Sequence, residues 1–357
     1  MQRTRLDPRS PLTDLHVHLG AAVTPAIMWG IAHAQGIRLP TKDYWAFRDL
    51  ITVGRRRLGF QAYLDLFHWT ELIQSSPIAV ERSVYEVIGG AYRRNNVTGL
   101  ELRFNPMKRN RGGEQDLDHI IAAAIRGMDR AILEYPQVRA GIVFCLDRSF
   151  SRELNEIIAS KAISWRTRGV VAIDIAGPVT DTFRFSDYTE IYAECRRAGL
   201  GLTVHAGETG GSDEVREALE ALEPDRIGHG VRAAEDPRVL AMLRERGTVL
   251  EVCPSSNLNT RVLADIGDLR RVVRAFVDHH VRFTVSTDGP EMLRTYLRDE
   301  LNLLMRHDIL SMDEVLRAVE IGVSASFLDR APTIETSVGA RPDAASLDAP
   351  IPVEAGA

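Results

Sequence analysis

The sequence predicts an α/β protein, a (β/α)8 TIM barrel, and three observations lead to this prediction. Eight short apolar runs recur along the 357 residues, and most end in a glycine, a proline or a polar residue, as strands buried on both faces do. Several intervals between the runs carry apolar residues at helical spacing. The length suits one barrel with insertions. An open doubly wound sheet is the alternative that this alternation leaves open.

The apolar runs are expected to be the eight strands of the barrel. In chain order they are residues 12–19, 100–106, 140–146, 170–177, 200–208, 226–230, 248–256 and 283–290. Helical spacing is clearest in residues 120–133, 188–198 and 269–277.

About 80 residues separate the first two runs, which is too many for one helix. Three segments there, 43–50, 59–73 and 80–95, read as extra helices. In a barrel they would cover the C-terminal mouth, so we expect a helical lid insertion after the first strand. The aromatic residues of these segments fit either a substrate gate or ordinary packing between helices.

Composition and charge limit the function classes. We expect one catalytic barrel domain over residues 1–330 and a disordered tail over residues 331–357, which are rich in Ala, Pro and Asp. The net charge of −5 gives no indication of nucleic-acid binding. No segment has the ~20 apolar residues of a membrane span, and the N-terminus lacks a signal-peptide core. The prediction is therefore a cytoplasmic protein without nucleic-acid or membrane partners.

Metal-binding residue types occur where predicted strands end, which is where barrel enzymes place their active residues. His16 and His18 end the first strand, His205 lies near the end of the fifth, and Asp288 near the end of the eighth. Residues i and i+2 of a strand point the same way, so both imidazoles of the first strand can face one point. Three histidines and an aspartate suit one Zn²⁺ ion per chain, with iron or manganese as alternatives. Zinc would lower the pKa of a bound water towards neutrality.

Two further residues are candidates for proton transfer. Glu208 follows His205 in a glycine-containing turn, and His229 ends the sixth strand. Glu208 could protonate a ring nitrogen of the substrate, while His229 could orient the water and take its proton. The alternatives are a surface acid and a hydrogen-bonded core histidine.

The order of several motifs resembles the adenosine deaminase family, from about residue 12 to about residue 328. The motifs are DLHVHL, ELRFNP, DIAG, VHAGE, RIGHG, VCPSSNL and TVSTDGP. The resemblance implies a zinc-dependent hydrolytic deaminase of an aminopurine nucleoside or related amino-heterocycle. In that reaction, metal-bound hydroxide attacks the amine-bearing carbon and ammonia leaves.

The resemblance also assigns roles to individual residues. The implied zinc ligands are His16, His18, His205 and Asp288, and the implied proton-handling residues are Glu208, which protonates N1 of the purine, and His229. Ser256 matches a serine that supports the metal site. The implied substrate-binding residues are Gly177, through its backbone N–H, the apolar gate residues Leu64 and Phe67, and Arg103 of the motif ELRFNP.

Three departures from the family pattern concern the substrate. Gly20 stands where the family carries a ribose-binding aspartate, and Gly289 stands where it carries an aspartate that binds N7. Pro178 and Val179 follow Gly177 in place of Asp-Glu. Losing polar contacts to a substrate can cost several orders of magnitude in specificity. We therefore expect a substrate other than adenosine, such as adenine, 6-amino-6-deoxyfutalosine or a methylated AMP.

Two basic clusters suggest an anionic group on the substrate. Arg55, Arg56 and Arg57 lie in the insertion, while Lys108, Arg109 and Arg111 follow the second strand. One cluster could bind a phosphate or carboxylate, and a solvated basic surface is the alternative.

Two other functions remain open at this point. One is a different metal-dependent amidohydrolase, although residues 170–177 contain no lysine to bridge a second metal. The other is a non-catalytic binding protein on the same fold, although both Glu208 and His229 are present.

Overall fold

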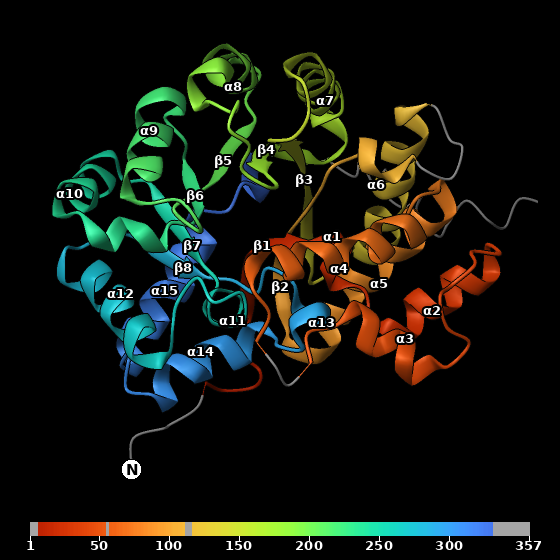
Figure 1. The fold of residues 1–357 in the computed structure, drawn as a ribbon, viewed down its shortest axis with the longest axis horizontal. Helices are drawn as coiled ribbons and strands as arrows, with labels where there is room; N and C mark the ends of the chain where they lie inside the picture. The colour runs from red at the N-terminus through yellow and green to blue at the C-terminus, as the bar shows by residue number, and fades with distance from the viewer. Residues whose placement is uncertain (1–5, 55–56, 111–115, 331–357) are drawn as a thin grey trace, which may run out of the picture.

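The computed structural model describes residues 6–54, 57–110 and 116–330. Eight parallel strands form the predicted (β/α)8 barrel, in the order in which they occur along the chain (Figure 1). The strands are β1 (Leu12–His18), β2 (Val97–Phe104), β3 (Arg139–Asp147), β4 (Val170–Ala176), β5 (Gly201–Ala206), β6 (Arg226–His229), β7 (Val249–Val252) and β8 (Phe283–Val285).

All eight predicted runs contain a strand, but the last two strands are shorter than expected. β7 ends at Val252 because Pro254 lacks a backbone N–H and begins the short helix α11 (Pro254–Asn259). β8 ends at Val285, and the residues after it leave strand geometry before Pro290 begins α13 (Pro290–Leu293). Functional side chains predicted for strands 7 and 8 therefore lie on the turns that follow them.

The long interval between β1 and β2 is helical, as the sequence predicted. It contains α1 (Leu19–Ala22), α2 (Pro25–Ala34), α3 (Tyr44–Ile51), α4 (Phe60–Ile73) and α5 (Pro77–Asn95). In Figure 1, α2 and α3 project to one side of the barrel, whereas α4 lies close to its centre.

The other helices follow the later strands and surround the sheet (Figure 1). They are α6 (Leu117–Glu134), α7 (Arg152–Ser164), α8 (Thr189–Arg197), α9 (Ser212–Leu222), α10 (Pro237–Arg246), α12 (Ile266–Asp278), α14 (Leu297–Arg306) and α15 (Met312–Ser324). Short 3₁₀ turns are η1 (Met107–Arg109), η2 (Arg166–Arg168), η3 (Phe185–Tyr188), η4 (Val231–Glu235) and η5 (Leu328–Arg330).

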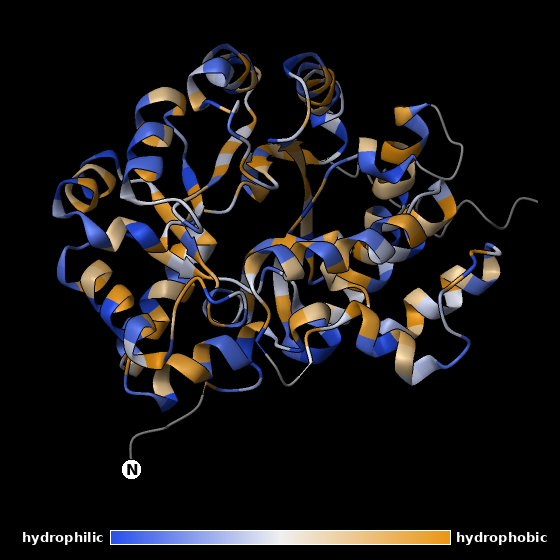
Figure 2. Cartoon of the chain, in the orientation of Figure 1, coloured by the Kyte–Doolittle hydropathy of each residue, from blue (hydrophilic) through white to orange (hydrophobic). Residues whose placement is uncertain are grey.

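The helices pack because each has one apolar face. In α12, Leu269, Val272, Val273 and Phe276 are buried at helical spacing, and Asp265 caps the first turn by accepting from Asp268 N–H. The ribbon coloured by hydropathy shows hydrophobic strands inside and helices that are hydrophilic on their outer side (Figure 2). None of the helices in the described ranges is both long and apolar enough to cross a membrane.

The barrel closes between its last and first strands through Asp288. Its backbone N–H donates to the carbonyl of His16, and its carbonyl accepts from the N–H of His18, both at 2.8 Å. These bonds place Asp288 beside β1 even though β8 ended three residues earlier. Three of the four residues predicted to bind a metal therefore also join the two ends of the sheet.

Candidate metal centre and active site

A cavity of about 330 Å³ opens at the C-terminal ends of the strands. Its floor includes His18, His205 and Asp288, and one wall is formed by residues of α4. This is the end of a barrel at which active sites lie. The cavity thus brings the predicted metal-binding residues together with part of the predicted lid.

Three histidines point one nitrogen each at the same place. The ligand atoms of His16, His18 and His205 lie within 4.8 Å of one another, and Nε2 of His18 is 3.2 Å from Nε2 of His205. Two nitrogens bound to one tetrahedral zinc ion at ~2.0–2.1 Å are about 3.3 Å apart. Nε2 of His16 is buried without a hydrogen-bond partner, so it is free to coordinate. These observations fit a metal held by the predicted histidines.

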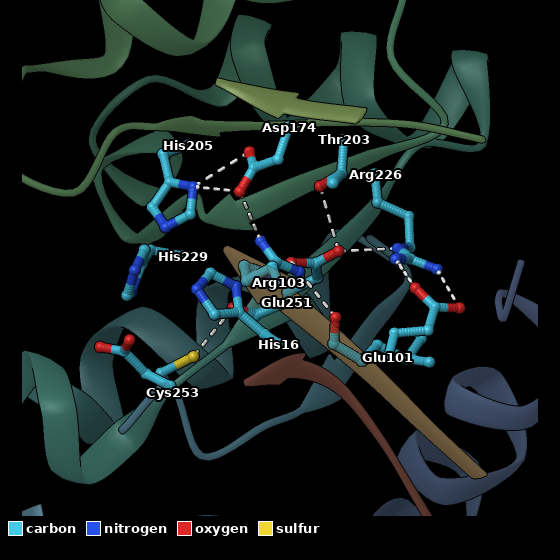
Figure 3. A network of polar contacts seen from close by, with 12 residues as sticks. His16, Glu101, Arg103, Asp174, Thr203, His205, Arg226, His229, Glu251 and Cys253 are labelled. Carbon is cyan, nitrogen blue, oxygen red and sulfur yellow. Dashed lines mark hydrogen bonds and ion pairs between the residues drawn. The ribbon is translucent and has the colours of Figure 1, made fainter. Parts of the chain in front are cut away.

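Buried carboxylates orient two of these histidines (Figure 3). The Nδ1 of His16 lies 2.7 Å from Glu251, and the Nδ1 of His205 lies 3.0 Å from Asp174. Each imidazole can donate Nδ1–H to its carboxylate and present the lone pair of Nε2 to the cavity. Metal-binding histidines commonly have such a partner, which fixes the tautomer and the ring orientation.

Arg103 joins the two carboxylates beneath the histidines (Figure 3). Its guanidinium donates to Asp174 at 2.9 Å and to Glu251 at 2.8 Å, and all three side chains are fully buried. Burial alone would raise the pKa of Asp174, but His205 and Arg103 more than reverse this and hold it well below its usual range. Arg103 also borders the cavity, so its predicted role in substrate binding stays a prediction, while its guanidinium pairs with the carboxylates that orient the histidines.

The network continues from Glu251 to the far end of the barrel. Arg226 donates to Glu251 at 2.7 Å and also pairs with Glu101. The Arg226 guanidinium lies 3.6 Å from the centre of the Phe327 ring, which closes this side of the network. Arg103 and Arg226 together compensate the buried charge of Glu251.

Asp288 is held on the opposite side of the histidines. Its Oδ1 lies 3.6 Å from Nε2 of His18, and its Oδ2 accepts from the Ser256 hydroxyl at 2.6 Å. Ser256, which the resemblance placed beside the metal site, thus contacts a predicted metal ligand. Asp288 and His229 adopt left-handed backbone conformations, with φ of 63° and 60°, which are uncommon outside glycine and occur often at functional sites.

Glu208 and His229 face each other across the cavity floor. Oε1 of Glu208 lies 3.6 Å from Nε2 of His229, and Asn257 lies 3.0 Å from the Nδ1 of His229. Burial, with the nearby charge of Asp288, raises the pKa of Glu208 well above its ordinary value. Burial, with His205, lowers the pKa of His229 well below its ordinary value. The shift of Glu208 favours its protonated form, as a proton donor requires. The shift of His229 favours its unprotonated form, as a proton acceptor requires.

The predicted substrate-binding residues surround the same cavity. Gly177, Leu64 and Phe67 all line it, and the Phe67 ring lies edge-on to His18 with centroids 6.3 Å apart. A Cβ at Gly20 would come 2.8 Å from the Phe67 ring and 3.3 Å from Nη2 of Arg109. The position of the family's ribose-binding acid is therefore taken by an aromatic ring beside a guanidinium.

The two basic clusters have different relations to the cavity. Lys108 and Arg109 line it, and Nζ of Lys108 is 2.5 Å from Asp147. Arg57 instead donates to the carbonyl of Ala264 and is not among the cavity residues. Arg55, Arg56 and Arg111 lie outside the described residues.

Several residues of the site were missed from the sequence. Asp174 and Glu251 are single acids within otherwise apolar strand segments, and such acids were the available signal because a buried charge needs a partner. Asn257 and Tyr63 carried no comparable signal. Cys253 also lies close, with its sulfur within 4.8 Å of ligand atoms of His16 and His229, which the cysteine spacing did not indicate.

Comparison with known sequences identifies the family. The sequence model of the family described as adenosine deaminase matches residues 11–335. The chain belongs to the adenosine deaminase family. An adenosine deaminase of Clostridium kluyveri is 28% identical over 320 residues, which cover 90% of each chain. Family membership makes the protein a hydrolase of the deaminase type, in preference to the two alternatives considered above.

Solved structures support the same fold. An adenine deaminase from Arthrobacter aurescens superposes with a TM-score of 0.78 at 21% identity, covering 90% of this chain and 97% of that one. A Burkholderia amidohydrolase with bound zinc gives 0.77 at 22% identity, covering 90% and 86%. The Arabidopsis N6-methyl-AMP deaminase gives 0.76 at 22% identity, covering 90% and 94%.

Proposed function

We propose that the protein is a zinc-dependent deaminase of an aminopurine that carries an anionic substituent. The observation that carries this proposal is the meeting of ring nitrogens of three histidines (His16, His18 and His205) beside a cavity floor that contains Asp288, Glu208 and His229. Membership of the adenosine deaminase family supports the reaction class. The zinc present in the Burkholderia structure supports the choice of metal.

In this proposal, His16, His18, His205 and Asp288 hold the metal. A bound zinc ion supplies a water of lowered pKa, and thereby a nucleophile at neutral pH. The convergence of neutral imidazoles with one carboxylate is the donor set that zinc prefers. Burial lowers the pKa of His16 and His18, which keeps their nitrogens unprotonated and able to bind.

Glu208 and His229 handle the protons. The raised pKa of Glu208 favours its protonated form, which can donate to a ring nitrogen of the purine. His229 is neutral because its pKa is lowered, so it can orient the attacking water and take a proton from it. The amine then leaves as ammonia or a small alkylamine.

The remaining cavity residues bind the substrate. Leu64 and Phe67 cover the purine from α4, and the backbone N–H of Gly177 faces its edge. Arg109 lies beside Gly20, and Lys108 lies on the same wall, so a phosphate or carboxylate of the substrate would reach both. Structures of this fold include an Arabidopsis N6-methyl-AMP deaminase, whose named substrate has this charge.

The test is ammonia or amine release by zinc-loaded protein from matched substrates. Adenine, adenosine, AMP and N6-methyl-AMP differ in the sugar, the phosphate and the leaving group. Ranking them by kcat/KM therefore separates the contribution of each of these three groups. We expect kcat/KM to be highest for a phosphorylated member. Release from adenine or adenosine alone would remove the anionic substituent from the proposal, and no release from any substrate would overturn the deaminase assignment to aminopurines.

A further inference from the structure

One side chain of α4 reaches the metal centre directly. Tyr63 is 3% exposed, and its hydroxyl donates to Oδ2 of Asp288 over 3.5 Å, at the long end of hydrogen-bond distances. Ser256 donates to the same oxygen at 2.6 Å. With Oδ2 held by two hydroxyls, Oδ1 is the oxygen that faces His18.

The space for the Tyr63 hydroxyl depends on Gly289. A Cβ at this position would lie 2.7 Å from the Tyr63 oxygen and 2.7 Å from the Cβ of Ala21. Both distances are too short for a real contact, so any side chain at position 289 would displace the phenol or the backbone. Tyr63 and Gly289 are therefore a matched pair, in which the hydroxyl occupies the space that a larger residue would fill.

The phenol ring of Tyr63 is packed between the insertion and α13. It belongs to an apolar cluster with Ala21, Val53, Met292 and Leu293. It also packs edge-to-face against Phe67, with ring centroids 5.6 Å apart. These contacts hold the ring so that its hydroxyl points at Asp288. Movement of α4 would therefore shift Tyr63 and the cavity residue Phe67 together.

We propose that Tyr63 is a positioning residue that orients Asp288 towards His18 and ties α4 to the metal centre. This inference deepens the proposed function, because it rests on Asp288 being a metal ligand. Through Tyr63, two properties depend on each other. One is the retention of the metal, and the other is the position of α4, the cavity wall that carries Leu64 and Phe67. Supporting residues of this kind contribute about 10–100-fold to metal affinity.

The first test compares Tyr63→Phe with Tyr44→Phe. Tyr63→Phe keeps the packed ring and removes only the hydroxyl, and the control removes a hydroxyl from α3 of the same insertion. We expect Tyr63→Phe to release zinc to a chelator about tenfold faster. Amide hydrogen exchange in α4 of the metal-free protein should also become faster, with α12 unchanged. Unchanged zinc release and unchanged exchange in α4 would overturn the proposal.

A second test examines the matched pair. Gly289→Ala should accelerate zinc release in the wild-type background, and less so in the Tyr63→Phe background, because one of the two close contacts has been removed. Equal effects in both backgrounds would contradict the pairing. If the wild-type protein takes up no zinc, the proposed function is overturned. Amide hydrogen exchange in α4, compared between wild type and Tyr63→Phe, would still decide whether Tyr63 ties this helix to Asp288.

Discussion

Glu251 lies 2.7 Å from the Nδ1 of His16, and both side chains are fully buried. Burial alone would raise the pKa of Glu251, but Arg103 and Arg226 outweigh it and lower the pKa to about 2. The carboxylate is therefore ionised at every pH at which the protein would work. It can accept Nδ1–H from His16 throughout this range and leave Nε2 available to a metal.

Replacing Glu251 should weaken metal binding. Glu251→Gln removes the charge that fixes the His16 tautomer, and we expect zinc affinity to fall by about 10–100-fold. Competition with a chromophoric chelator measures this loss. Glu245→Gln, on the exposed face of α10, is the matched control. Equal zinc affinity in both variants would show that Glu251 does not support the metal.

Arg103 should matter for stability more than for substrate affinity. Arg103→Gln leaves Asp174 and Glu251 with less compensating charge in the core, which typically costs about 3–5 kcal/mol in the free energy of unfolding. Urea denaturation of the metal-free protein measures the difference. A variant of normal stability with a greatly raised KM would instead support a direct contact between Arg103 and the substrate.

Glu208→Gln should separate catalysis from metal binding. The amide cannot donate an acidic proton, so we expect kcat to fall by about 10²–10⁴-fold while zinc content stays at one per chain. Zinc analysis and steady-state kinetics on the same preparation provide both readouts. Glu220→Gln, exposed on α9, should behave like the wild type. Normal turnover by Glu208→Gln would exclude the proposed role of this residue.

The raised pKa of Glu208 also predicts a pH-dependent difference in stability. In the unfolded chain Glu208 loses its proton near the ordinary value of 4.5, whereas in the folded protein it keeps the proton to higher pH. As pH rises above 4.5, ionisation of Glu208 in the unfolded chain lowers the free energy of unfolding. This decrease continues until pH passes the raised pKa of the folded protein. The Tm of metal-free wild-type protein should thus decline relative to Glu208→Gln as pH rises. A constant difference in Tm would show that the pKa is not raised.

Arg109 should distinguish charged from neutral substrates. Arg109→Ala should raise KM for a phosphorylated substrate and leave KM for adenine or adenosine little changed, because only the former carries a charge for the guanidinium to bind. Arg57→Ala is the control from the other basic cluster, since Arg57 is not among the cavity residues. A larger effect at Arg57 would move the anion-binding role to the insertion.

The sequence was sufficient to predict the strands and the meeting of three histidines and one aspartate at their carboxyl ends, because both follow local rules. Continuous apolar runs indicated buried strands, and His16, His18, His205 and Asp288 lay at or near the ends of such runs. The ends of β7 and β8 were less predictable, since β7 stops just before Pro254 and β8 is only three residues long.

Contacts between distant segments could not be predicted in this way. Arg103 lies in a strand whose end faces the cavity, and only the fold shows that Asp174 and Glu251 meet its guanidinium. Tyr63 belonged to a group of aromatic residues that fitted either a substrate gate or ordinary packing between helices. Its contact with Asp288 depends on the path of α4 and on the space left by Gly289.

The closure of the barrel through Asp288 has a consequence for how the protein is made. His16 and His18 leave the ribosome early, whereas Asp288 follows them only after about 270 further residues. The hydrogen bonds that join these residues, and with them the complete set of proposed metal ligands, can form only when synthesis is nearly finished. Tight zinc binding would therefore distinguish a completed chain from a truncated one, and a nascent protein would acquire its metal at the last stage of folding.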